Sequence, residues 1–308
     1  MGSSTSISWT DATFNPWWGC TRVSPGCEHC YAETFSKRVG KKVWGVSADR
    51  LFFADAHWDE PRLWNKRASQ SSKPFRVFCA SMADWLEARE DLIEPRARLV
   101  RLIAETPELT WLMLTKRPEN FAALAPREWV SAGCPQNVHM GVTAENQYYW
   151  NKRVAELRGI KAYRRFVSIE PMLDHIHLDG DAASLWDGDY ASTSHKMHWA
   201  GRWHRHIHQV IVGAESGPGA RPFHLSWARS IVNQCKEHGV ACFPKQMGSN
   251  PIVDRIILAS GNGRVECPHG VDVCPICDAG ETHVRLTGKG DDPSEWPGGP
   301  WPQEFAPL

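Results

Sequence analysis

The chain has 308 residues, of which 35 are Lys or Arg and 35 are Asp or Glu, so its formal net charge is zero. This balance lacks the basic excess typical of proteins that bind nucleic acid without regard to its sequence. No apolar run reaches the length of a membrane span, and residues 1–6 lack the pattern of a secretory signal, so we expect a soluble, cytoplasmic protein with no membrane partner.

The first chemical motif along the chain is a group of three cysteines. Cys20 and Cys27 are separated by six residues, and Cys27 and Cys30 by two. Three such thiolates could hold three irons of a [4Fe–4S] cluster and leave the fourth iron without a protein ligand. A structural zinc with His29 or a distant residue as the fourth ligand explains the spacing equally well. The spacing therefore predicts a metal centre and leaves both metals open.

Apolar, β-branched runs recur along the chain, with helical patterns between them. Such runs are typical of parallel strands that are buried on both faces. The alternation predicts an α/β fold of parallel βα repeats, either TIM-barrel-like, as a full or a partial barrel, or an open sheet. Two of the helical patterns cover residues 91–105 and 227–237. The expected strands are 76–80, 109–114, 138–142, 165–169, 209–213 and 239–243.

Charged or polar side chains follow each of these expected strands. In βα barrels, the C-terminal ends of the strands form the rim on which sites are built. Polar residues also mark ordinary loops, but their recurrence after successive strands favours a shared polar cleft. The residues of interest at these ends are Ser81, Asp84, Lys116, Arg117, Glu145, Glu170, Gly213, Glu215, Ser216 and Lys245.

Residues 175–208 interrupt the alternation of strands and helices. This segment is rich in Asp, Ser, Gly, Trp and His, and its histidines are irregularly spaced. We therefore expect a surface insertion within a βα domain of residues 1–250.

Residues 251–308 are expected to form a small C-terminal segment that depends on a metal. The segment is rich in Gly and Pro and poor in apolar residues, so a bound metal would supply the stability that a core cannot. Its three cysteines repeat the spacing of the first group, which predicts zinc, with an auxiliary iron–sulfur cluster as the alternative. The expected ligands are Cys267, Cys274 and Cys277, with His269 or His283.

Several ordered motifs resemble those of one known family. They are Ser8–Pro16, the cysteine loop ending in Cys30–Glu33, Ser81–Asp84, Leu114–Pro118, Ser168–Leu173, Gly213–Pro222 and Lys245–Gln246. Together they are similar to the phage three-cysteine-motif family, also called the gene product 37 / gene product 68 family, a domain of unknown function found in phages and bacteria. The resemblance runs from Ser8 to about Gly248 and resumes at residues 288–297.

The cysteine loop of that family is similar to the cluster loop of radical S-adenosylmethionine enzymes, including the Cys-Tyr ending of spore photoproduct lyase. The resemblance implies a [4Fe–4S] cluster on Cys20, Cys27 and Cys30, S-adenosylmethionine as a second cofactor, and a partial or full βα barrel. More residues separate Cys20 from Cys27 than in those enzymes. Family members are often encoded beside a dedicated partner protein, so a complex with such a protein is expected.

On this hypothesis, the strand-end groups bind the cofactor and act on the substrate. Cationic side chains would contact a carboxylate or phosphate, and the amides of residues 213–220 could hold an anion or an adenine edge. Buried ion pairs with the same cations are the alternative for Glu170 and Glu215. Cofactor-binding candidates are Ser81, Asp84, Arg117, Glu145, Gly213, Glu215 and Ser216, and catalytic candidates are Lys116, Glu170 and Lys245.

Two classes of function remain open at this point. The first is a radical enzyme that acts on a nucleobase or a nucleic-acid modification, a substrate class suggested by the phage distribution of the family. The second is a zinc-stapled, non-catalytic binding or scaffold protein for a partner or nucleic acid. The polar groups at six strand ends favour the first.

Overall fold

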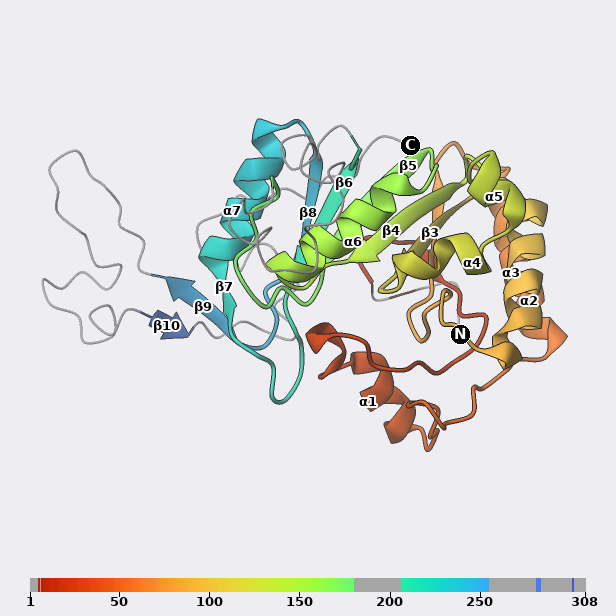
Figure 1. Cartoon of the computed structure of the whole chain (residues 1–308), viewed down its shortest axis with the longest axis horizontal. Helices are drawn as coiled ribbons and strands as arrows, with labels where there is room; N and C mark the ends of the chain where they lie inside the picture. The colour runs from red at the N-terminus through yellow and green to blue at the C-terminus, as the bar shows by residue number, and fades with distance from the viewer. Residues whose placement is uncertain (1–4, 6, 180–205, 255–280, 284–300, 302–308) are drawn as a thin grey trace, which may run out of the picture.

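A parallel sheet of seven strands, curled into a half-barrel, forms the centre of the molecule (Figure 1). The computed structural model describes residues 5, 7–179, 206–254, 281–283 and 301. The strand order is β1-β2-β3-β4-β5-β6-β8, so each strand pairs with the next strand of the sheet along the chain. This confirms the expected α/β fold of parallel βα repeats as a partial barrel. The strands are β1 (Ala12–Thr13), β2 (Phe75–Cys79), β3 (Leu109–Thr115), β4 (Val138–Thr143), β5 (Arg164–Ile169), β6 (Gln209–Gly213) and β8 (Ala241–Gln246).

Both faces of the sheet are buried, which explains why its strands are continuous apolar runs. In β4 every residue is buried, and Val138, Met140 and Val142 join the large core. The alternate side chains of the sheet point to the concave face, because successive residues of a strand face opposite sides. A second apolar cluster fills that face, with Trp9 of the N-terminal segment among its members: Trp9, Phe78, Leu112, Phe166, Ile211 and Phe243.

Helices cover the outer face of the half-barrel. Figure 1 shows α2 and α3 beside one end of the sheet and α7 beside the other. Leu99, Leu102 and Ile103 of α3 are buried in the large core, as the apolar spacing predicts. None of the described helices is both long and apolar enough to cross a membrane. The helices are α1 (Tyr31–Arg38), α2 (Asp55–Ala68), α3 (Ile93–Glu105), α4 (Phe121–Leu124), α5 (Arg127–Ser131), α6 (Gln147–Gly159) and α7 (Leu225–Glu237).

A small second sheet lies beside α7, with the order β10-β9-β7. Its strands are β7 (Phe223–His224), β9 (Pro251–Asp254) and β10 (Glu281–His283). β9 pairs in parallel with β7, so the start of the expected C-terminal segment is joined by hydrogen bonds to the chain that precedes α7. Most of the expected insertion and of the C-terminal segment lies outside the described residues.

Gly141 in β4 sets the packing of the concave face. A Cβ atom built at this position would lie 2.2 Å from Cζ of Phe166 and 2.5 Å from two further atoms of the same ring. The Phe166 ring therefore rests directly on the Gly141 backbone and completes the concave apolar cluster. A side chain at residue 141 would push the ring out of a close-packed interior.

We expect Gly141→Ala to lower the free energy of unfolding by about 1–3 kcal/mol, the usual effect of overpacking. Gly159, at the end of α6, is the matched control because a Cβ built there meets nothing within 4 Å. Gly159→Ala should be neutral or slightly stabilising. Urea unfolding of both variants checks this, and equal effects would contradict the proposed Gly141–Phe166 packing.

Candidate functional site

A polar cleft opens at the C-terminal ends of the sheet strands, and the three N-terminal cysteines line it. Its empty volume, including space open to solvent, is about 1200 Å³. The structure thus brings most of the residues singled out from the sequence to one place. Those that line the cleft are Cys20, Cys27, Cys30, Ser81, Asp84, Lys116, Arg117, Glu170, Glu215, Ser216 and Lys245.

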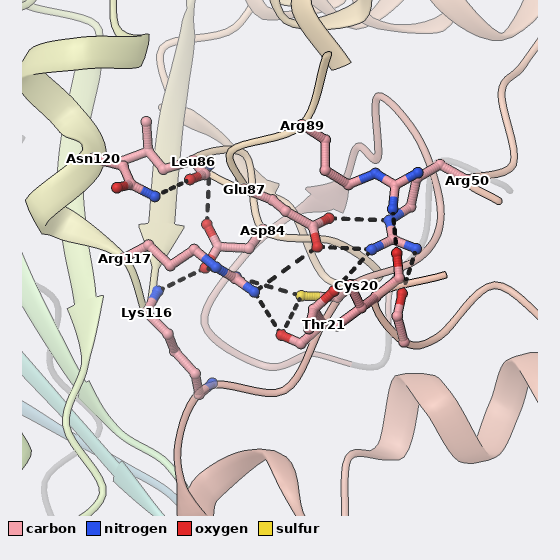
Figure 2. A network of polar contacts seen from close by, with 12 residues as sticks. Cys20, Thr21, Arg50, Asp84, Leu86, Glu87, Arg89, Lys116, Arg117 and Asn120 are labelled. Carbon is pink, nitrogen blue, oxygen red and sulfur yellow. Dashed lines mark hydrogen bonds and ion pairs between the residues drawn. The ribbon is translucent and has the colours of Figure 1, made fainter. Parts of the chain in front are cut away.

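The first cysteine is fixed by an ion pair between the ends of β2 and β3. Arg117 Nη1 donates to Asp84 Oδ2 at 2.9 Å and to Cys20 Sγ at 3.5 Å. Its Nη2 donates to the carbonyl oxygen of Thr21 at 2.5 Å. Figure 2 shows Arg117 between Asp84 on one side and Cys20 and Thr21 on the other. The guanidinium thus connects the strand ends to the start of the cysteine loop, residues 20–30.

The Asp84 carboxylate is fully occupied by protein donors. Besides Arg117, it accepts hydrogen bonds from Thr115 Oγ1 at 2.7 Å and from the amides of Leu86 and Lys116 at 3.0 and 2.9 Å. Burial alone would raise its pKa, but Arg117 and these donors hold the pKa below its ordinary value. Asp84 is therefore an ionised positioning group in this structure, and its oxygens already have partners.

A second buried ion pair stands behind the first (Figure 2). Arg50 Nη2 lies 2.7 Å from Glu87 Oε1, and both side chains are buried. Arg50 also donates from Nη2 to Thr21 Oγ1 at 3.1 Å, and from Nη1 to the carbonyls of Val43, Gly45 and Ala48. This pair supports the cysteine loop from the side away from the strands.

Glu145, at the end of β4, holds the middle of the cysteine loop. Its carboxylate is fully buried, pairs with Arg153 of α6 at 2.7 Å, and accepts a hydrogen bond from the amide of Gly26 at 3.2 Å. Gly26 has no side chain, which permits this approach, because a Cβ there would lie 3.1 Å from Glu145 Cδ. Glu145 does not line the cleft; it contacts the loop from behind.

Glu215, after β6, holds the far end of the loop through Arg221. The two side chains form an ion pair, and Arg221 also donates to Pro25 O at 3.0 Å and to Glu28 Oε2 at 3.1 Å. Glu215 Oε2 lies 3.1 Å from His29 Nδ1. Burial raises the pKa of Glu215, but Arg221 and His29 more than offset this and lower it. Three residues of the loop therefore depend on one carboxylate–arginine pair.

We call these three pairs the loop clamp: Asp84–Arg117, Glu145–Arg153 and Glu215–Arg221. Four of the expected cofactor-binding side chains belong to this clamp: Arg117, Glu145 and Glu215 contact the cysteine loop directly, and Asp84 holds Arg117 in place. The alternative of an ion pair for Glu215 is the arrangement found, although its partner is Arg221 and not one of the strand-end cations considered from the sequence. Arg50, Glu87, Arg153 and Arg221 were not expected at the site, although Arg221 belongs to the Gly213–Pro222 motif.

The floor of the cleft carries a second set of polar groups. Lys245 Nζ lies 2.7 Å from Glu170 Oε1, the alternative ion pair considered for Glu170. Gly213 leaves room for that carboxylate, since a Cβ there would lie 3.0 Å from Glu170 Oε1. Lys116 Nζ donates to Thr143 Oγ1 at 3.4 Å and has no carboxylate partner among the described residues. Lys116 is therefore available to an anionic ligand.

Ser81 and Ser216 are the remaining candidates, and both line the cleft. Ser81 Oγ accepts a hydrogen bond from Asn15 Nδ2 at 3.1 Å, and its carbonyl accepts one from Tyr31 Oη at 2.9 Å. Ser81 therefore ties β2 both to the N-terminal segment and to the residue that follows Cys30.

The three loop cysteines offer a soft donor set at one edge of the cleft. Burial raises the pKa of the Cys20 thiol to about 12 and also raises that of Cys30, so without a metal these thiols keep their protons. A bound metal would displace these protons, since the thiolate is the form of cysteine that binds metals. Within the described residues, no three His, Cys, Asp or Glu side chains are gathered closely enough to hold a metal ion. Binding a cluster would therefore require the loop to draw its sulfurs together.

The other cysteines of the described residues do not line this cleft. Cys79, Cys235 and Cys242 are buried in the large core, and Cys134 packs against it, as expected for ordinary core thiols. The expected C-terminal ligands, Cys267, His269, Cys274 and Cys277, lie outside the described residues.

The clamp and the cysteine loop both fall inside a region shared with other proteins. Residues 4–292 match the family described as protein of unknown function (DUF5131). The chain belongs to this family. Membership confirms the expectation of a domain of unknown function, and the description of the family names no reaction. No curated protein and no solved structure matches the chain.

We expect Arg221→Gln to loosen the cysteine loop, because glutamine is uncharged and too short to reach Pro25 and Glu28 while contacting Glu215. Amides of residues 21–30 should exchange with deuterium about tenfold faster, as loss of charge-assisted hydrogen bonds implies. The control is Arg62→Gln, which removes an exposed ion pair between Arg62 of α2 and Glu105 of α3. Unchanged exchange in the Arg221 variant, measured by mass spectrometry, would contradict the clamp.

Proposed function

We propose that the protein is an iron–sulfur enzyme of the radical S-adenosylmethionine type. The proposal rests on one observation: three thiols of a single loop line a polar cleft at the C-terminal rim of a parallel half-barrel. In βα barrels this rim is where active sites are built. Three ion pairs hold the loop at the rim. A loop that only connects two elements at the surface does not need so many charged contacts.

The donor set supports a cluster with an open iron. The loop supplies three sulfur ligands, and Cys79, Cys134, Cys235 and Cys242 lie elsewhere, so no fourth cysteine of the described chain reaches the cleft. A [4Fe–4S] cluster held in this way supplies, when bound, an electron for the reductive cleavage of S-adenosylmethionine. Cys20, Cys27 and Cys30 would hold it.

The rest of the cleft would bind and orient the second cofactor and the substrate. Lys116 offers an ammonium group that no described carboxylate neutralises, which suits the carboxylate of S-adenosylmethionine or a phosphate. The Glu170–Lys245 pair and Ser216 offer further polar contacts to a bound ligand. The Asp84–Arg117 pair keeps Cys20 at the wall of the cleft and so fixes where the loop can present its sulfurs.

The substrate class and the partner rest on the resemblance to the phage three-cysteine-motif family. On that basis the substrate is a nucleobase or a nucleic-acid modification, and a dedicated partner protein joins the enzyme. The neutral net charge fits a substrate recognised within the cleft better than one bound along a basic surface.

Anaerobic purification with iron, sulfide and zinc analysis tests the proposal. We expect Cys27→Ala to hold about four irons fewer than the wild type, because one missing thiolate prevents assembly at this loop. Cys134→Ala, at a half-buried cysteine remote from the cleft, is the matched control and should keep its iron. Comparing the two variants separates the loop from any metal at the C-terminal cysteines.

Reduction of the wild-type protein with S-adenosylmethionine should then release deoxyadenosine, and Cys27→Ala should not. Zinc without iron at the loop would favour the alternative, a non-catalytic binding or scaffold protein with His29 or a distant residue as the fourth ligand. Full retention of iron in Cys27→Ala would overturn the assignment of the cluster to this loop.

A further inference from the structure

A small second cavity lies at the opposite end of the half-barrel, beneath the concave apolar cluster. Its empty volume, including open solvent, is about 400 Å³, a third of that of the cleft. It is bounded by the first residues of β5 and β6 and by His139, the second residue of β4. The N-terminal ends of barrel strands are remote from the catalytic rim, so this cavity belongs to neither the cleft nor the cysteine loop.

The cavity is lined by hydrogen-bond donors that have no partner in the protein. Trp9 Nε1, Arg164 Nε and Gln209 Nε2 are all buried and make no hydrogen bond. Trp9 and Gln209 are themselves more than nine-tenths buried. Buried donors without an acceptor are rare and unfavourable, because each loses its hydration without replacement. Three such donors around one cavity call for an acceptor inside it.

The cavity also carries positive charge that the described protein leaves uncompensated. Arg76 pairs with Asp11 at 3.2 Å, and Arg165 donates to the carbonyls of Leu157 and Ile160. Arg164 has no carboxylate partner among the described residues, and no described Asp or Glu lines the cavity. Burial, together with Arg164 and His208, lowers the pKa of His139 to about 4, so this imidazole is neutral at pH 7.

We infer that this cavity is a binding site for one small inorganic anion of the size of chloride. A water molecule has two acceptor sites, fewer than the three unpartnered donors, whereas a halide accepts several hydrogen bonds and compensates the guanidinium charge. The anion holds the starts of β5 and β6 together by accepting hydrogen bonds from Arg164 and Gln209, and it compensates the charge of Arg164. It is structural and independent of the chemistry in the cleft.

The first test is the thermal stability of the full chain in sodium bromide, with sodium gluconate keeping the ionic strength constant. We expect a saturable rise in the melting temperature of the wild type, because an anion that binds only the folded state stabilises it. In Arg164→Met the apparent bromide affinity should fall at least about tenfold, as expected for the loss of a charge-assisted contact. Arg67→Met, at an exposed arginine of α2, should respond like the wild type.

The readout is the bromide-dependent shift within each variant, so a lower stability of Arg164→Met itself does not obscure the result. Gln209→Leu should weaken the response in the same direction, because it removes an unpartnered donor without changing the charge. Anomalous scattering from bromide-soaked crystals should place a peak between Trp9, Arg164 and Gln209. Equal bromide responses in all four proteins, with an ordered water in the cavity and no anomalous peak, would overturn the inference.

Discussion

The cysteine loop keeps its place because three carboxylate–arginine pairs at the strand ends contact its backbone, through Arg117, Glu145 and Arg221. A loop that contains one short 3₁₀ turn, Pro25–Cys27, and no strand cannot satisfy its own polar groups. Asp84–Arg117, Glu145–Arg153 and Glu215–Arg221 supply partners for it at successive points. Because the three carboxylates are buried, each would be strongly unfavourable without its arginine, and this cost keeps the pairs together. The position of the thiols beside the cleft depends on these contacts.

The half-barrel provides the strand ends that carry this clamp. Because all seven strands are parallel, their C-terminal residues meet at one rim. The concave apolar cluster beneath that rim, completed by Trp9 and by the Phe166 ring on Gly141, separates the cleft from the donor-lined cavity at the other end. One face of one sheet thus supports two polar sites with an apolar layer between them.

The strands and the rim were predictable from the sequence because they depend on local patterns. The apolar run of β4 is buried throughout, and the polar residues that follow it mark the C-terminal end of the strand. The partners of those residues were not predictable in the same way. Arg221 reaches Glu28 across 193 positions, and Arg50 reaches Glu87 across 37, and no periodicity indicates such a pairing. The sequence marked Glu215 as important, but only the fold shows that its carboxylate serves the loop.

The separation of Glu28 and Arg221 in the sequence also affects when their contact can form during folding. Pairing of neighbouring strands joins segments that are close in sequence and so forms early, whereas contacts across most of the chain require the intervening units to be in place. During synthesis the cysteine loop emerges first, yet its last anchor arrives only after β6 has joined the sheet. Until then the contacts that position the three thiols are incomplete. The geometry of the cysteine loop is therefore completed only after the barrel strands that support it.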